Sequence, residues 1–229
     1  RIAVVSNTIR PFDLRGRIGS GDVVFGGTIA LDGYLPSQFN LTANGRSMRL
    51  RYPEGFDSTV DMSLALTGSI TAPVLSGDVD VLKVRLRPQA QGTGFGFCGF
   101  DAGFLAGGAA PVAASLSSQG AAAGPAIALD LRVNAPRMSF IDTKNARLDA
   151  EANLEVHGTF DAPAITGYVD IVSGEVVCNG NRYFVREGSR ITFPPGAEFD
   201  PVFEVSAETR ARLASETYTV SVAISGTTS

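Results

Sequence analysis

The chain lacks tryptophan and carries one histidine and two cysteines among its 229 residues, and only 18% of its residues are charged. An average globular protein has about 25% charged residues. Cys98 and Cys178 form neither a C-x-x-C motif nor a metal-ligand spacing, and whether they pair with each other is left open. His157 has no second histidine or cysteine to share a metal with. We therefore expect no metal, no cofactor and no enzyme activity.

The small number of charged residues also limits the kinds of partner that the chain is expected to bind. The net charge is −4, and no basic stripe offsets phosphate repulsion, so a nucleic-acid partner is not expected. No apolar run approaches the roughly 18 residues of a membrane span. The chain begins at Arg1 inside strand-like sequence, which suggests a segment of a longer protein. Carboxylates stand singly on predicted outward strand faces, so nothing marks a glycosidase-type acid pair.

The main pattern along the sequence is an alternation of apolar and polar residues with a period of two. It is clearest at 60–67, 148–157 and 217–225, and it is typical of strands with one apolar and one polar face. No window has a 3.6-residue apolar stripe with caps. Turn residues recur about every 8–12 residues. The pattern predicts an all-β fold with almost no helix, built as one elongated sheet.

One motif occurs twice. The stretch LTGSITAPVLSGDVDV (66–81) returns without a gap as VHGTFDAPAITGYVDI (156–171), at an offset of 90 residues. The similarity extends upstream, so the repeated units are about 39–82 and 129–172. We interpret the motif as strand, glycine, short turn with Ala-Pro, strand, used twice in one domain spanning 1–229.

A segment of different composition separates the units. Residues 91–124 are rich in Gly, Ala and Ser and show no periodicity. Such a segment buries too little apolar area to offset the entropy of ordering it, so we predict a flexible insert. Its cluster Phe95, Phe97, Phe100, Phe104 and Leu105 is a candidate for docking on an apolar surface.

Three stretches carry a family resemblance, namely RYPEGFDSTVDMSLALTGSITAPVLSGDVDV (51–81), the run from Thr166 to Ala211, and YTVSVAISGT (218–227). They resemble the C-terminal region of the TamB family, the translocation and assembly module proteins of the AsmA-like, bridge-like lipid-transfer group. In the second run the matching elements include Tyr183–Phe184 and Asp200–Pro201. The order and spacing of the elements carry the resemblance.

The resemblance implies a twisted sheet curled along its length into a taco or open β-roll with a hydrophobic groove. It implies a protein of the periplasm of a diderm bacterium, with an inner-membrane anchor that this chain lacks. A TamA-type outer-membrane barrel is the implied protein partner. The implied activities are phospholipid movement to the outer membrane and assistance to outer-membrane protein assembly.

Strand parity then supplies candidate groove-lining residues for phospholipid acyl chains, although the same positions could be ordinary core between two sheet walls. They are Ile29, Leu31, Leu41, Met48, Leu50, Met62, Leu64, Leu66, Val79, Val81, Leu129, Leu131, Met138, Phe140, Leu154, Val156, Val169, Ile171, Phe203, Val205, Tyr218, Val220, Val222 and Ile224.

Two other functions stay open. The sheet could be a scaffold that chaperones outer-membrane proteins or supports secretion by β-augmentation. It could also be a secreted β-solenoid enzyme or adhesin, but that needs a cluster of acids or aromatics on an exposed face. The sequence identifies neither the lipid species nor the direction or driving force of transport.

Overall fold

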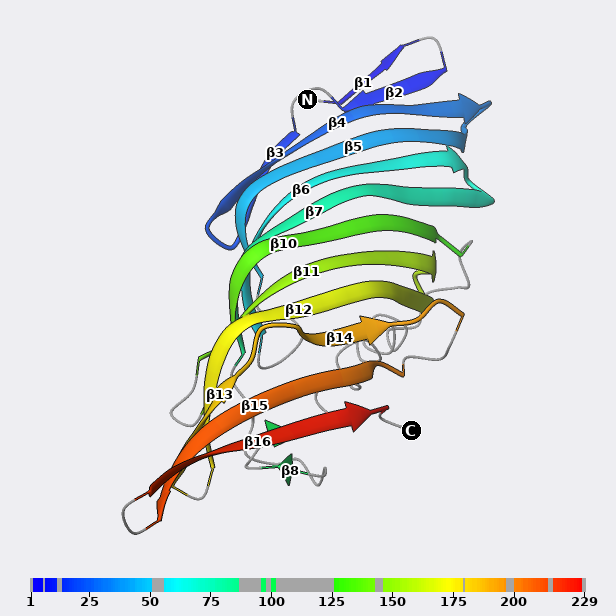
Figure 1. The fold of residues 1–229 in the computed structure, drawn as a ribbon. Coiled ribbons are helices and arrows are strands. Elements are labelled where there is room, and N and C mark those ends of the chain that lie inside the picture. Colours follow the sequence, from blue (N-terminus) through cyan, green and yellow to red (C-terminus); the bar gives the residue numbers. More distant parts are fainter. Residues whose placement is uncertain are drawn as a thin grey trace.

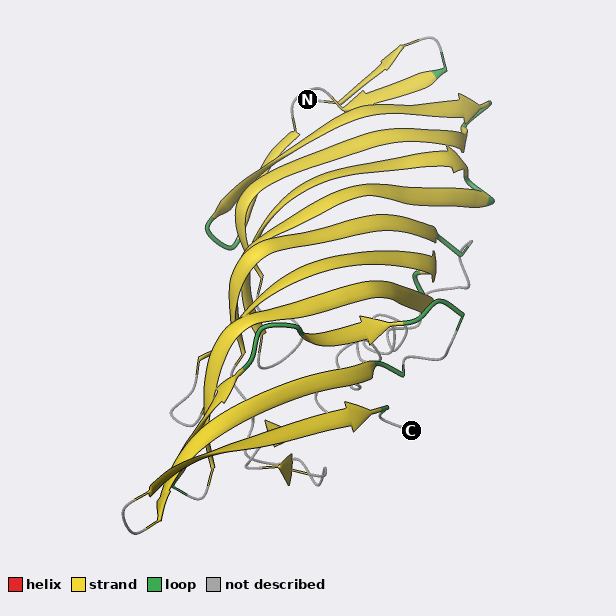
Figure 2. Ribbon diagram, viewed as in Figure 1, coloured by secondary structure: helices red, strands yellow, loops and turns green. Residues whose placement is uncertain are grey.

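A computed structural model describes residues 2–5, 7–11, 14–50, 56–86, 96–97, 100–101, 126–142, 146–178, 180–196, 200–213 and 216–227. Within these ranges all regular structure is β-strand and no helix occurs, which confirms the predicted all-β fold (Figure 2). Most of the 91–124 insert lies outside the described residues, as does Cys98. The prediction of a flexible insert therefore stays untested, and whether Cys98 and Cys178 pair stays open.

Fourteen strands form one sheet, in the order β1-β2-β4-β5-β6-β7-β10-β11-β12-β13-β15-β14, with β3 on β4 and β16 on β15 (Figure 1). Their bounds are β1 (Ile2–Val5), β2 (Thr8–Pro11), β3 (Leu14–Ile18), β4 (Gly21–Asp32), β5 (Leu35–Leu50), β6 (Phe56–Ser69), β7 (Ala72–Leu86), β10 (Ala128–Asp142), β11 (Ala146–Thr159), β12 (Ala162–Cys178), β13 (Asn181–Val185), β14 (Ser189–Phe193), β15 (Val202–Leu213) and β16 (Glu216–Gly226). A separate pair, β8 (Gly96–Phe97) and β9 (Phe100–Asp101), belongs to the insert.

The sequence repeat corresponds to two triplets of strands. β5, β6 and β7 carry the first copy, and β10, β11 and β12 carry the second. Because a triplet has an odd number of strands, its first and last strands point the same way. β7 and β10 therefore pair in parallel, whereas all other pairs of the described sheet are antiparallel. A parallel neighbour requires a crossover connection, which is supplied by the chain between Leu86 and Ala128.

The two copies also share their turn chemistry. The backbone N–H of Ala72 donates to Ser69 Oγ, and that of Ala162 donates to Thr159 Oγ1, each at 3.2 Å. The turns are 70–71 and 160–161. The sequence reading placed the turn at Ala-Pro, but these residues begin β7 and β12. A proline at the start of a strand loses no ladder hydrogen bond.

The long strands change register at similar levels and bend. Register shifts occur between Gly45 and Met48 in β5, at Val60 opposite β7, and between Ala135 and Met138 in β10. The shift between β11 and β12 lies at Ala150. Bulges bend strands and increase their twist, and Figure 1 shows the long strands curving sharply on the side away from the 33–34, 70–71 and 160–161 turns. We call this line of shifts the bend line.

The bend line divides the sheet into two arms. The turn arm is the part between the bend line and the turns at 33–34, 70–71 and 160–161, and the far arm is the part beyond it. The curled taco outline remains a prediction, since a bend of this kind does not by itself close the sheet.

The buried side chains lie at or next to the bend line. They form three clusters, whose largest members are Met48, Val60, Leu148, Val169, Ile171, Ile191 and Phe193. Met48 is 1% exposed. Side chains on the inside of a bend approach one another from both arms, so they exclude water there. Among the described residues the core is therefore a strip along the sheet.

Candidate functional site

One face of the sheet, which we call the inner face, carries continuous apolar rows that cross the strands. One row runs through β4, β5, β6, β7, β10, β11, β12 and β14 as Val23, Gly45, Met62, Val79, Val133, Leu154, Gly167 and Phe193. The next row is Phe25, Ala43, Leu64, Gly77, Leu131, Val156 and Ile165, and a third is Gly27, Leu41, Leu66, Leu75, Leu129, Gly158 and Pro163. No polar side chain interrupts these rows.

Much of the inner face on the turn arm is only half-buried. Met62, Leu64, Leu66, Leu131 and Leu154 all keep part of their surface exposed, in contrast to the side chains at the bend line. No second sheet of the described chain covers them, since β8–β9 is the other sheet and has two short strands. The apolar side chains of these rows are thus partly accessible to solvent on the turn arm and closely packed at the bend line.

Most of the residues that strand parity selected share this face through their cross-strand partners. Examples are Leu41 with Leu66, Leu131 with Val156, and Val205 with Ile224. Phe140 falls at a register shift between Ser139 and Ile141, so parity alone does not orient it. The side chains of Met138 and Phe140 lie outside the described residues. Whether the selected positions line a lipid groove is not tested by their register.

Some inner-face residues were missed by the sequence reading. Val23 and Phe25 belong to the run VVF (23–25). Because three apolar residues follow one another there, alternation does not show which of them face the inner side. Ile191 and Phe193 alternate with polar residues and could have been found by the same rule that found the others. Both are buried at the centre of the largest cluster.

The inner face ends at β16 with exposed apolar side chains. Tyr218, Val220 and Ile224 are 48%, 43% and 45% exposed. β16 pairs with β15 over eleven residue pairs without a register shift, and no charged residue occurs between Glu216 and Gly226. Edge strands are usually protected by charges, prolines or bulges, and in the described part of β16 beyond Glu216 none of these occurs.

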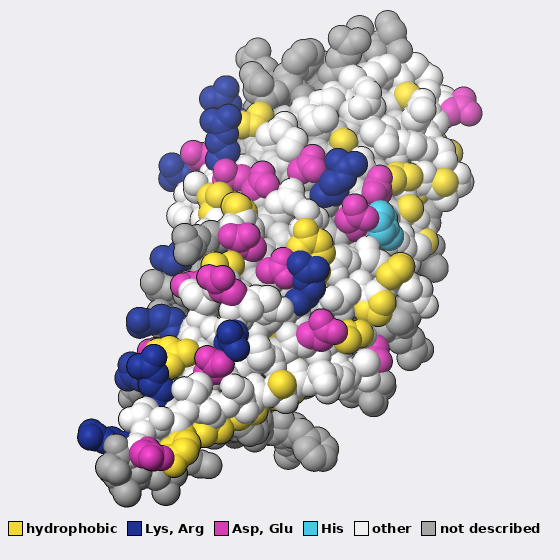
Figure 3. Space-filling model, viewed as in Figure 1, with side chains coloured by type: hydrophobic (Ala, Val, Ile, Leu, Met, Phe, Trp, Pro, Cys, Tyr) yellow, Lys and Arg dark blue, Asp and Glu magenta, His cyan; other side chains and the backbone are white. Residues whose placement is uncertain are grey.

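The opposite, outer face is polar and carries cross-strand ion pairs (Figure 3). Arg190 binds Asp170 at 2.5 and 2.9 Å and lies 4.6 Å from the Tyr168 ring centroid. The hydrogen bond to Asp170 raises the pKa of Arg190 because it favours the charged guanidinium. Arg49 pairs with Asp57 in the same way. Exposed pairs of this kind add little stability, but they keep the outer face wettable.

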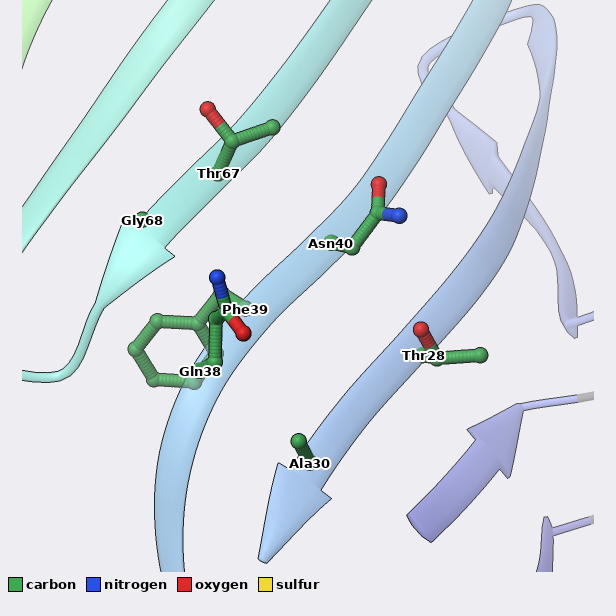
Figure 4. Close-up of a pocket in the computed structure, with 7 residues that line it drawn as sticks. All are labelled: Thr28, Ala30, Gln38, Phe39, Asn40, Thr67 and Gly68. Carbon is green, nitrogen blue, oxygen red and sulfur yellow. The ribbon is translucent and has the colours of Figure 1, made fainter.

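The outer face also carries the single histidine of the chain. His157 lies 3.2 Å from Glu155 and 3.6 Å from Asp130 and is half-exposed. No group of three or more metal-ligating side chains occurs among the described residues. A polar depression crosses β4, β5 and β6 and is lined by Thr28, Ala30, Gln38, Phe39, Asn40, Thr67 and Gly68 (Figure 4). Its lining holds no charged side chain.

Comparison with known proteins identifies the family. The model of the TamB C-terminal domain matches residues 12–229, which confirms the resemblance noted in the sequence. No curated protein and no solved structure matches the chain. The ranges that the structure describes contain no helix that is long and apolar enough to cross a membrane. The family belongs to the translocation and assembly module, whose role is in outer-membrane biogenesis and whose barrel partner is of the TamA type. A large bent β-sheet with three apolar rows on one face is thus the form taken by this chain, which belongs to the TamB C-terminal domain family.

Proposed function

We propose that this chain is a segment of a periplasmic lipid conduit, in which phospholipid acyl chains lie along the inner face of the sheet. The observation that carries the proposal is the set of apolar rows that cross seven or eight neighbouring strands without a polar side chain. At about 4.8 Å per strand, such a row is on the order of 30 Å long.

The energetics suit transport. Each buried CH₂ contributes about 0.8 kcal/mol, so a sixteen-carbon tail gains on the order of 12 kcal/mol relative to water. A bilayer offers the same gain, so passage from a bilayer to a continuous apolar face is nearly balanced in free energy. A polar side chain within a row would create a step in that profile. Such a conduit needs no catalytic group.

The half-buried state of the turn arm supports the proposal further. An apolar core that serves only stability is normally closed to water, because exposed apolar surface contributes nothing to folding. Here Leu64 and Leu154, at equivalent positions of the two repeats, keep accessible surface on the inner face. An acyl chain would cover that surface.

A crosslinking experiment tests this function. A photo-reactive amino acid is placed in the full-length protein at Leu64 or Leu154, and at the outward neighbours Ser63 or Asn153 as matched controls. After irradiation in cells, phospholipid adducts are expected at Leu64 and Leu154 and not at the control positions. Absence of adducts at both inner positions, with the protein folded and present at normal level, would overturn the proposal.

A second candidate function is favoured by the unprotected edge of β16. Its free backbone groups and exposed Tyr218 and Val220 suit pairing with an incoming strand. In this case the sheet would chaperone outer-membrane proteins or dock a TamA-type barrel by β-augmentation. The same photo-reactive residue placed at Thr219 would then capture protein and not lipid.

A further inference from the structure

The cations of the outer face are divided unequally by the bend line. Of the described Lys and Arg residues with placed side chains, Arg15, Arg132 and Arg190 lie on the turn arm. The far arm and the bend line carry Arg17, Arg46, Arg49, Lys83, Arg147, Arg182, Arg186, Arg210 and Arg212. Figure 3 shows Lys and Arg gathered along one side of the visible face.

The acids are more numerous on the turn arm, although seven of the described acids lie on the far arm or at the bend line, namely Asp22, Asp57, Asp149, Glu175, Glu187, Glu208 and Glu216. The turn arm and its loops carry Asp32, Asp61, Asp78, Asp80, Asp130, Glu151, Glu155, Asp161, Asp170, Asp200 and Glu204. On the far arm several acids are neutralised by ion pairs, such as Asp22 with Arg17, Glu175 with Arg182, and Glu208 with Arg186. The two long sides of the sheet therefore differ in sign.

The far-arm cations have a recurrent position. In β3, β5, β11 and β15 an arginine is the second residue from the far end of the strand: Arg17, Arg49, Arg147 and Arg212. The terminal residue beside each is apolar, namely Ile18, Leu50, Ala146 and Leu213. Adjacent residues of a strand point to opposite faces. β3, β5 and β11 thus end with a basic side chain outside and an apolar one inside.

Several far-arm cations are also available for a partner. Lys83, Arg210 and Arg212 are exposed, and none of them makes an ion pair within the described part of the chain. The aliphatic stem of an arginine can lie against the edge of an apolar surface while its guanidinium stays in water. At a strand end, such a side chain reaches the boundary between the inner face and solvent.

We infer that the far ends of the strands form a basic rim that binds the phosphates of lipids whose tails lie on the inner face. This inference rests on the proposed conduit function and adds which side of the sheet faces the head groups. The acidic turn arm repels phosphate, so lipids orient with their head groups at the far rim. Neutral lipids with the same tails lack this interaction.

The test uses the purified chain, detergent-solubilised lipids and native mass spectrometry. Dipalmitoyl phosphatidylglycerol is compared with dipalmitoyl glycerol, which has the same tails and no phosphate. The double variant Lys83→Gln/Arg212→Gln removes two rim charges that make no ion pair. The double variant Arg132→Gln/Arg190→Gln is the control, because it removes the same charge from the turn arm.

For the wild type we expect phosphatidylglycerol to be favoured over the neutral lipid. The rim variant should lower this preference about tenfold or more, since each Lys or Arg near anionic head groups contributes about 1 kcal/mol, and should leave binding of the neutral lipid unchanged. The control variant should keep the preference. Inorganic phosphate at millimolar concentration should not displace the lipid, because the tails supply most of the binding.

Three outcomes would overturn the inference. These are an equal preference in both variants, an equal loss in both variants, and displacement by inorganic phosphate, which would indicate a plain anion site. If neither lipid binds to any form of the protein, the conduit function itself fails. That result is distinct from lipid binding without a phosphate preference, which leaves the conduit function intact and removes only the basic rim.

Discussion

The side-chain oxygen of Ser189 on β14 accepts a hydrogen bond from the backbone N–H of Ser206 on β15, at 3.1 Å. The same hydroxyl lies 2.8 Å from the carbonyl oxygen of Arg186 and donates to it. Ser189 is 1% exposed. It stands where β13 gives way to β14, and β12 and β15 each pair with both of these short strands. One hydroxyl thus holds the break between two strands in place.

Replacing this hydroxyl should destabilise the sheet. Ser189→Ala leaves the Ser206 N–H without its partner in a buried setting and removes one of the two hydrogen bonds to the Arg186 carbonyl, which costs about 1–3 kcal/mol. Urea unfolding followed by circular dichroism measures the change in the free energy of unfolding. Ser173→Ala is the control, because its hydroxyl is exposed and makes a long 3.4 Å hydrogen bond to Asp149. Equal losses in the two variants would show that the strand break does not depend on Ser189.

A glycine in the middle of β7 should resist substitution. Gly77 has φ 141°, and a Cβ built on it would lie 2.1 Å from the carbonyl oxygen of Ser63. Gly167 has the same environment in the second repeat, with 2.2 Å to the Asn153 oxygen. Gly77→Ala should lower the free energy of unfolding by at least about 1–3 kcal/mol through backbone strain, with further loss from the clash. Gly16→Ala, whose added Cβ would lie 4.0 Å from Phe25 Cε2, an ordinary contact at an ordinary φ, should change stability little.

The loss of stability on shortening a valine to alanine should depend on where the valine lies in the sheet. Val169 at the bend line is 7% exposed, whereas Val220 on the edge strand is 43% exposed. Val169→Ala removes two buried methyl groups and should cost about 1.5–3 kcal/mol. Val220→Ala should remain within about 0.5–1 kcal/mol. Thermal or chemical unfolding of the two variants distinguishes them, and similar losses would place the stabilising core elsewhere.

A charged side chain introduced on the inner face should stop lipid transfer without unfolding the sheet. Leu64→Arg and Leu154→Arg each place a guanidinium in an apolar row at a half-buried position, where its long stem can still reach water. Transfer of fluorescent phospholipid between vesicles, or outer-membrane lipid content in cells, should fall to background. Ser63→Arg puts the same group on the outer face and should leave transfer unchanged. Normal transfer by both inner variants would count against the conduit.

The edge of β16 gives a prediction for the second candidate function. Val220→Lys points a charge along the inner face of the edge strand, a device by which natural sheets prevent pairing. Strand capture at β16, measured by crosslinking to the protein partner, should then drop several-fold. Lipid crosslinking at Leu64 should be unaffected. Loss of both signals together would mean that one site serves both partners.

Much of this architecture follows from residues whose side chains alternate regularly. The alternation around Leu64 and Leu154 was enough to predict strands, face and repeat, because burial of one face imposes a strict period of two. Bulges were not predictable, since each inserts a residue without changing composition, and Phe140 shows how one shift removes the parity argument. The parallel joint between β7 and β10 depends on the number of strands per repeat, which the sequence motif alone did not define.

The odd number of strands in each repeat has a consequence for how long such a sheet can become. One copy of the triplet can be inserted or deleted without reversing the direction of any strand that follows. The apolar side chains of the strands on either side then still lie on the same face. Each copy changes the span by about 14 Å, three times the strand spacing, at a cost of 90 residues of sequence. The length of such a sheet therefore changes in steps of one triplet, and duplication of the triplet is the step that lengthens it.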